Sequence, residues 1–409
     1  MKIQQGYKQT KVGVIPEDWE IVKSQDALQR IRNKVDVQLN EHYQQIGIRS
    51  HGKGIFHKEA VTGEVLGNKS VFWIEPDCFV VNIVFAWEQA VGKTTDNEKG
   101  MIASHRFPMY QSKDNRVDID YLLYFFKSKR GKHLLGLASP GGAGRNKTLG
   151  QNEFSKLNLP LPPLKEQQKI AQILSTWDSA IVKQSELIEQ KKQLKRGLMQ
   201  KLLSGEVRFD GFSEEWEEVK LGEILIEHKE KSNAQCEVHS VSVHKGIINQ
   251  IEHLGRSFSA SDISNYNLVK PYDIVYTKSP TGDFPYGIVK QNMNDYNAIV
   301  SPLYGVFTPK NKYLGYILHV YFESPIRTSN YLKSIIQKGA KNTINITNKT
   351  FLSKKLVLPI NETEQQKIAE VLSLADREIA LLKNELDTLK KQKGGLMQRL
   401  LMGEVRVKG

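Results

Sequence analysis

Two long stretches of the chain carry apolar residues at alternating steps of four and three positions, which is the spacing of a coiled-coil seam. In the later stretch nine of the ten seam positions are apolar, and only Lys393 is charged. The earlier stretch keeps the same spacing but places Gln184, Lys191 and Lys195 in the seam. We therefore predict two long helices that pair with each other. The residues expected to form the pairing surface are Ile170, Leu174, Trp177, Ile181, Ile188, Leu198 and Leu202 in the first helix and Ile368, Leu372, Ile379, Leu382, Leu386, Leu389, Leu396 and Leu400 in the second.

Both predicted helices have start and stop signals. Pro162-Pro163 precedes the first helix, Asn361 precedes the second, and Gly205 and Gly403 mark the two ends. About forty residues that each rise about 1.5 Å make a rod of about 60 Å. The alternative is two ordinary amphipathic helices folded into separate domains, which would require unusually long domain helices without a breaker.

The same stretches reveal that the chain is a tandem repeat. Residues 166–208 align without a gap to residues 364–406, an offset of 198 residues. A second similarity lies upstream, where residues 16–23 resemble residues 213–220. The chain therefore consists of a globular unit, a helix, a second globular unit and a second helix. We expect domains at 1–160, 161–205, 206–358 and 359–409.

The globular units have the pattern of mixed α and β structure. Short apolar and β-branched runs at 78–85 and 273–276 stand between Gly, Asn and Pro residues, which is typical of strands. Near the end of each unit a helix is expected, over 119–130 and over 314–324. The predicted fold class is α+β, with two mixed α/β domains in tandem, each followed by a long helix.

The net charge of +13 is concentrated in two equivalent segments. Residues 127–156 and 325–355 each contain seven basic residues, and together they account for the whole excess. Each segment holds a loop rich in Gly, Asn, Thr and basic residues, at 139–148 and 337–347, which suits contact with phosphates and base edges. We expect nucleic acid as the partner; the alternative is that these lysines only keep two surface loops soluble. The candidate DNA-binding residues are Arg145, Asn146, Lys147, Lys278, Lys338, Lys341 and Asn342.

The sequence lacks the signatures of catalysis and of cofactor or metal binding. Gly92-Lys93-Thr94 resembles the end of a phosphate-binding loop, but Trp87 stands where that loop needs its first glycine. The ten histidines show no zinc-type pair. His105-Arg106 could contact DNA or serve packing. We predict no catalytic, cofactor-binding or metal-binding residues in this chain.

The two cysteines, Cys78 and Cys236, are too few for a disulfide framework, which favours a reducing compartment. No stretch reaches the roughly 18 apolar residues of a membrane span, and the first residues lack an export signal. A cytoplasmic location is expected.

Several motifs recur in order and in duplicate. LPLPPLKEQQKIAQIL (159–174) is echoed by LPINETEQQKIAEVL (358–372), and GLMQKLLSGEVRF by GLMQRLLMGEVRV. The opening motifs are GVIPEDWEIV (13–22) and FSEEWEEVKLGEI (212–224). Over essentially its whole length the chain resembles the specificity subunit of a type I restriction-modification system.

That resemblance implies a non-catalytic subunit with two target recognition domains, each reading half of a split double-stranded DNA sequence. It implies that the helices pair as an antiparallel coiled coil with pseudo-twofold symmetry and dock two methyltransferase subunits, which in turn bring restriction subunits. S-adenosylmethionine, ATP and magnesium would belong to those partners. Because the two globular units differ, the DNA target should be asymmetric.

Two other functions remain as alternatives. A coiled-coil scaffold that binds nucleic acid without sequence preference would explain the helices and the charge, but not two differing units placed between repeated motifs. A nuclease or methyltransferase in its own right would need the catalytic motifs that the sequence lacks.

Overall fold

The structure is a computed structural model that describes residues 5–141, 147–232, 236–256, 262–335, 337–338 and 344–407. It contains two units. Unit 1 comprises Met1–Ser185 and Asn384–Gly409, and unit 2 comprises Glu186–Lys383. Each unit therefore includes one globular part together with a portion of both long helices.

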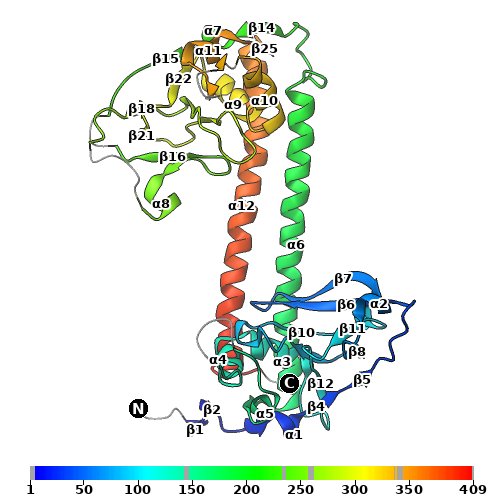
Figure 1. The fold of residues 1–409 in the computed structure, drawn as a ribbon. Coiled ribbons are helices and arrows are strands. Elements are labelled where there is room, and N and C mark those ends of the chain that lie inside the picture. Colours follow the sequence, from blue (N-terminus) through cyan, green and yellow to red (C-terminus); the bar gives the residue numbers. More distant parts are fainter. Residues whose placement is uncertain are drawn as a thin grey trace. The chain divides into compact units, whose positions relative to one another are not determined.

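The long helices are α6 (Leu164–Leu202) and α12 (Glu362–Leu401), drawn in green and in orange to red in Figure 1. They run antiparallel within each unit. In unit 1, Lys393 Nζ lies 2.5 Å from Asp178 Oδ1, and Gln184 Nε2 donates to Glu385 Oε2 at 2.9 Å. The residue number on α12 falls as the number on α6 rises, which defines the antiparallel direction.

All fifteen residues of the predicted pairing surface are buried or half-buried. Those at the outer turns also join the cores of the globular parts: Ile170, Leu174 and Leu400 belong to the core of unit 1, and Leu202, Ile368 and Leu372 to the core of unit 2. Along the middle of the helices several apolar residues outside the seam are exposed instead, among them Val182, Leu194, Leu374 and Leu381. The helix ends thus serve as core elements of the units as well as pairing surfaces.

The polar seam positions of α6 are matched by acidic residues of α12. Lys191 Nζ lies 2.6 Å from Glu378 Oε1, and Lys195 Nζ lies 2.6 Å from Asp376 Oδ1. Burial alone would lower the pKa of Lys195, but the nearby charges of Glu323 and Asp376 outweigh it and hold that pKa above its usual value. These positions therefore interrupt the apolar seam without leaving buried charges unpaired.

Unit 1 is built on two sheets, with strand orders β10-β9-β12-β4 and β5-β8-β11-β6-β7. The strands of the first are β4 (Leu28–Ile31), β9 (Phe79–Val81), β10 (Val91–Lys93) and β12 (Met109–Ser112). Those of the second are β5 (Asn33–Lys34), β6 (His42–Arg49), β7 (Gly54–Thr62), β8 (Val71–Trp73) and β11 (Ile102–Ser104). Two further pairs are β1 (Tyr7–Thr10) with β2 (Gly13–Pro16), and β3 (Glu20–Lys23) with β13 (Asn158–Leu161). The helices are α1 (Ser24–Ala27), α2 (Gly63–Leu66), η1 (Ala86–Glu88), η2 (Asp96–Glu98), α3 (Ile119–Lys127), α4 (Lys129–Leu137) and α5 (Gln151–Ser155).

Unit 2 repeats the central sheet, here with strand order β15-β22-β19-β20. Its strands are β15 (Leu225–Glu227), β19 (Ile274–Tyr276), β20 (Val289–Gln291) and β22 (Gly305–Pro309). The paired strands around it are β14 (Glu217–Lys220) with β25 (Lys355–Leu358), β16 (His239–Ser242) with β17 (Gly246–Asn249), β18 (Asn267–Val269) with β21 (Ala298–Val300), and β23 (Gln337–Lys338) with β24 (Ile344–Asn345). The helices are α7 (Leu221–Ile224), α8 (Gln250–Leu254), α9 (Lys312–Tyr321), α10 (Pro325–Lys333) and α11 (Asn348–Ser353).

The local elements differ in extent from the sequence-based expectation. The helix expected at 119–130 is divided into α3 and α4, because Ser128 adopts an extended backbone and its side chain accepts from Gly131 N at 3.1 Å as an N-cap. The strand expected at 78–85 ends at Val81, where the Asn82 side chain accepts from Val84 N at 3.1 Å and forms a turn. In the described part of the chain no helix is both long and apolar enough to cross a membrane.

The repeated sequence motifs meet in each unit in a contact that we call a clasp. In unit 1, Glu166 at the start of α6 is 4% exposed and accepts from Trp19 Nε1 at 3.3 Å. The same carboxylate accepts from Arg406 Nε and Nη2, both at 2.9 Å, and the Glu166 hydrogen bond is the main reason why the pKa of Arg406 is raised. The start of one helix is thereby tied to the residues that follow the other.

Unit 2 contains a second clasp with the roles of the helices exchanged. Glu364 at the start of α12 is 1% exposed, accepts from Trp216 Nε1 at 3.3 Å, and accepts from Arg208 Nε and Nη2, both at 2.8 Å. A buried carboxylate requires such donors and a counter-charge. The recurrence of Trp, Glu and Arg in the sequence repeat therefore has a structural cause.

A second duplicated contact attaches each globular part to both helices. In unit 1, Tyr124 on α3 donates to Asp178 Oδ2 at 2.7 Å, and the other oxygen of Asp178 pairs with Lys393. In unit 2, Tyr316 on α9 donates to Asp376 Oδ2 at 2.5 Å, and Asp376 pairs with Lys195. The equivalent aspartates and lysines are again 198 residues apart in the sequence, as the repeat requires.

The seam makes a testable prediction about stability. Ile188→Ala removes a side chain that is 3% exposed and should lower the free energy of unfolding by about 2–4 kcal/mol. Leu194→Ala is the matched control on the same helix, because Leu194 is 57% exposed, and its effect should stay within about 0.5 kcal/mol. Urea unfolding followed by the helical circular dichroism signal measures both, and equal losses for the two variants would refute the assigned seam.

Candidate nucleic-acid interface

Two neighbouring loops form the candidate interface in unit 1. The first, residues 82–90, connects β9 to β10; the second leads from α4 to α5, and the structure describes its residues 138–141 and 147–150. Ile83 joins them, because its carbonyl accepts from Leu149 N at 2.8 Å while its own N donates to the carbonyl of Arg106 at 3.0 Å. Segments that are distant in sequence are thus brought to one surface.

Cationic and aromatic side chains gather on this surface. Lys147 Nζ lies 5.7 Å from the centre of the Trp87 ring, within the range of a cation–π contact. Arg106 is exposed, as is its neighbour His105, and Phe85 is 37% exposed. Neither Arg106 nor Lys147 has an ion-pair partner in the part of the chain that the structure describes. Their exposure favours a contact role for His105-Arg106 over a packing role.

In unit 2 the corresponding surface contains Lys278, which comes two residues after β19 just as Ile83 comes two residues after β9. Lys278 is half-buried and has a φ of 59°, in the left-handed region that lysine seldom adopts. Burial lowers the pKa of Lys278, although the charge of Glu227 acts in the opposite direction. Glu227 in turn accepts from Asn348 Nδ2 at 2.9 Å, at the start of α11. Lys278 therefore lies near the end of the basic loop that precedes α11.

The other candidate residues are only partly covered by the structure. Arg145, Asn146, Lys341 and Asn342 lie outside the described residues. Lys338 lies in β23, which pairs antiparallel with β24, and only its backbone is described. Of the seven candidates, Lys147 and Lys278 are those whose side chains the structure places.

Several basic residues of the two charged segments have structural roles. Arg130 donates to the carbonyl of Val12. Lys354 Nζ donates to the carbonyls of Asn330 and Tyr331, both at 3.1 Å. Two others are in ion pairs, Lys156 with Glu153 at 3.2 Å and Lys355 with Glu218 at 3.4 Å. Net charge alone therefore overstates the number of cations available to a polyanion.

Lys93 also has a structural role. Its Nζ pairs with Asp77 Oδ1 at 2.8 Å and with Asp120 Oδ2 at 2.7 Å. These contacts account for the lysine of the Gly92-Lys93-Thr94 run. Among the described residues no group of three or more His, Cys, Asp or Glu side chains could hold a metal ion.

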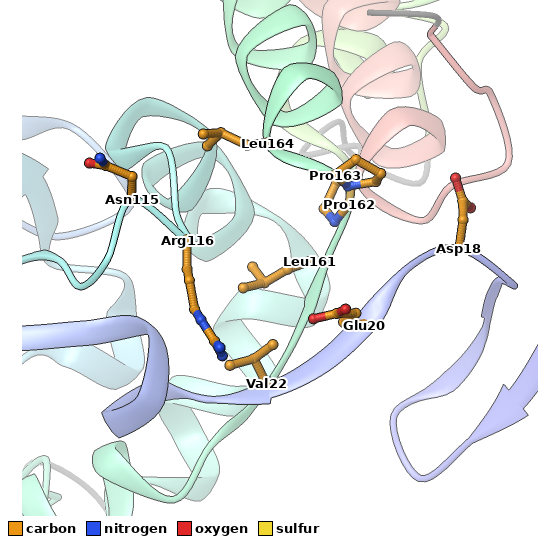
Figure 2. Close-up of a pocket in the computed structure, with 9 residues that line it drawn as sticks. All are labelled: Asp18, Glu20, Val22, Asn115, Arg116, Leu161, Pro162, Pro163 and Leu164. Carbon is orange, nitrogen blue, oxygen red and sulfur yellow. The ribbon is translucent and has the colours of Figure 1, made fainter.

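A hollow of about 330 Å³ lies where strand β13 leads into α6. Figure 2 shows Arg116 extending from its loop toward the strand that carries Val22, with Glu20 further along that strand. Asp18 at its rim pairs with Arg406 at 2.5 Å, and this hydrogen bond lowers the pKa of Asp18. The remaining lining residues are Asn115, Leu161, Pro162, Pro163 and Leu164. Acidic and basic groups are mixed here and Asp18 belongs to the clasp region, so the hollow has no features that favour a polyanion.

Comparison with known proteins identifies the family. The family model for the type I restriction modification DNA specificity domain matches residues 16–193 and again residues 213–391. A putative type I restriction enzyme MjaX specificity subunit of Methanocaldococcus jannaschii is 24% identical over 99% of this chain and 98% of its own length. The type I restriction enzyme MjaVIII specificity subunit of the same organism is 28% identical over 96% of this chain and 94% of its own.

A solved structure supports the same fold. The S subunit of a type I restriction-modification system from M. genitalium superposes with a TM-score of 0.58 at 13% identity, covering 98% of each chain. The family model matches each half of the chain once, and each match runs from the opening motif into the long helix, which confirms the resemblance that the motifs indicate. The chain belongs to the type I restriction modification DNA specificity domain family and is a specificity subunit, a non-catalytic component with two target recognition domains.

Proposed function

We propose that unit 1 and unit 2 each read one half of an asymmetric, bipartite double-stranded DNA sequence through the paired loops described above. The observation that supports this most strongly is that the two units share the contacts that hold their framework together but differ in the loops at their surface. Both units share the clasp and the Tyr-Asp-Lys contact, yet the loops on this frame carry different side chains. A shared frame with different reading surfaces is what two unequal half-sites require.

The loop chemistry supports a division of roles. Lys147, Arg106 and Lys278 supply charge for phosphate contacts, which give affinity that falls as salt rises. Arginine and lysine can also donate to guanine in the major groove, whose pattern of donors and acceptors distinguishes all base pairs. At equivalent positions unit 1 has Ile83 and unit 2 has Lys278. The two units therefore offer different groups to the DNA.

We propose that the long helices also dock two methyltransferase subunits, through which restriction subunits join. S-adenosylmethionine, ATP and magnesium would be bound by those partners. In unit 2, α12 exposes Leu374 and Leu381, which are 62% and 69% exposed. Residues seven apart on a helix lie on the same face, so these two leucines offer an apolar surface away from the seam.

The two-reader proposal is tested by exchanging residues 210–350 for the equivalent unit of a related protein. Methylome sequencing of a host that expresses the exchanged chain with its methyltransferase subunit should show a motif in which one half has changed and the other is retained. The intact chain is the control and should give one discrete bipartite motif. If both halves changed together, independent reading would be excluded; if no discrete motif appeared for the intact chain, the nonspecific scaffold would be favoured.

The docking proposal predicts that Leu381→Glu weakens the complex with the methyltransferase subunit about tenfold or more, because a charge replaces an apolar contact. Ala380→Glu is the matched control: the residue is also exposed but points about 100° away around the helix. Both variants should fold normally, and titration of the purified chain with the methyltransferase subunit measures their affinities. Equal affinities for the two variants would show that this face does not dock.

A further inference from the structure

Arg30 in unit 1 is a half-buried cation with no counter-ion in the described part of the chain. It lies on strand β4, and its Nη1 donates to Gln151 Oε1 at the start of α5. Its Nε atom is buried and has no hydrogen-bond partner. Burial lowers the pKa of the Arg30 guanidinium; Tyr110 acts in the opposite direction, and the charge of Arg32 adds a smaller lowering. The surroundings thus remove water from a charge without neutralising it.

Arg30 lines a hollow of about 250 Å³ whose other lining residues are a mixture of polar and apolar side chains without an acidic group. Ser24 and Gln25 border it from α1, and Asn152 and Ser155 border it from α5. Apart from Arg30, the lining residues are Ser24, Gln25, Leu28, Tyr110, Gln151, Asn152, Phe154 and Ser155, none of which is charged at neutral pH. The hydroxyls of Ser24 and Ser155 already donate to backbone carbonyls, at 3.4 and 2.8 Å. The side-chain amides of Gln25, Gln151 and Asn152 can donate to an oxyanion, but they cannot replace the missing negative charge.

The position of this hollow links it to the candidate interface. It includes Gln151 and Asn152, the first two residues of α5, and α5 begins three residues after the basic loop at 139–148. The same loop carries Lys147, which lies over Trp87. A DNA strand that contacts this loop would therefore have its phosphates near the rim of the hollow.

Unit 2 has the opposite charge at the equivalent position. Arg30 stands opposite Tyr110 where β4 pairs with β12, and Glu227 stands opposite Phe307 where β15 pairs with β22. Each side chain also contacts the side-chain amide of the first residue of a short helix. This residue is Gln151 of α5 in unit 1 and Asn348 of α11 in unit 2. At this position the two units therefore differ in charge, although the surrounding strands and the amide contact are the same.

We propose that Arg30 and the polar groups around it form a binding site for a phosphate group, and that the phosphate belongs to the DNA backbone held by unit 1. This inference rests on the proposed function, because it assumes that unit 1 contacts DNA. A bidentate contact with a phosphate would supply the negative charge that the guanidinium lacks. The contact would add affinity and set the position of the DNA without reading bases.

The test compares Arg30→Gln with the wild-type chain, each assembled with its methyltransferase subunit. DNA affinity is measured from low to high salt on the cognate sequence and on unrelated DNA. Losing one phosphate contact should weaken binding on both DNAs alike and reduce the slope of log affinity against log salt by about one. Glutamine can still bond with Gln151, and Arg30→Lys should restore most of the slope.

Lys156→Gln is the matched control, because it removes one nearby positive charge that is already paired with Glu153 at 3.2 Å. It should leave the slope unchanged. The melting temperatures of all variants are compared in phosphate and in chloride at equal ionic strength. If the salt slope of Arg30→Gln equals that of the wild type while phosphate stabilises only the wild type, the site takes free phosphate and the DNA assignment is overturned.

If neither the slope nor the response to phosphate depends on Arg30, the phosphate site itself is refuted. That result would leave the bipartite motif of the wild-type chain intact. Failure of the proposed function would instead appear as a wild-type complex without a discrete motif, so the two failures are distinguishable.

Discussion

A buried carboxylate at the start of each long helix needs a counter-charge, and the residues that follow the other helix supply it. Glu166 receives Arg406, and Glu364 receives Arg208. Because burying an unpaired charge is costly, this requirement determines where the chain must return after each helix. In unit 1 the segment between α12 and Arg406 has a further contact, since the Tyr7 hydroxyl donates to the carbonyl of Gly403 at 2.8 Å. The strands, loops and reading surfaces are built on this arrangement.

The polar contacts along the helices likewise pair buried charges with groups of opposite charge. In unit 2, Lys195 pairs with Asp376 and also with Glu323, at 2.8 Å, and Glu323 further pairs with Lys290 and His319, both at 3.3 Å. Burial opposes ionisation of Glu323, but the hydrogen bond from His319 and the charges around it lower its pKa well below the usual value. Burial also lowers the pKa of His319. Such a network fixes the position of the two helices relative to the globular part of unit 2, because a shift along either helix would leave several buried groups unpaired.

The sequence predicted the long helices and their pairing surface better than it predicted the candidate nucleic-acid interface. The four-and-three spacing identified both helices, and no residue of the expected pairing surface is exposed. The spacing could not show that Lys191 and Lys195 face Glu378 and Asp376, because that pairing depends on the antiparallel direction, which came only from the family resemblance. Nor could it show that Glu166 contacts Arg406, because contacts across 240 residues leave no local pattern.

The candidate interface was harder to predict for a related reason. Counting charge treats all lysines and arginines alike, whereas Lys354 and Arg130 bind backbone carbonyls. Arg30 lies outside the charged segments and has no sequence signal; it is distinguished only by its partial burial at a hollow that has no acidic lining residue. Exposure and pairing are properties of the fold, so they separate contact residues from structural ones only once the fold is known.

The rest of each unit depends on the clasp that holds it to the returning chain, and a double-mutant cycle measures the strength of this contact directly. Arg406→Ala, Glu166→Ala and the double variant should give a coupling free energy of about 2 kcal/mol, because the carboxylate is buried and the contact is bidentate. The same cycle on the exposed pair Lys355 and Glu218 should give about 0–1 kcal/mol. A coupling at the clasp no larger than that of the exposed pair would contradict the account.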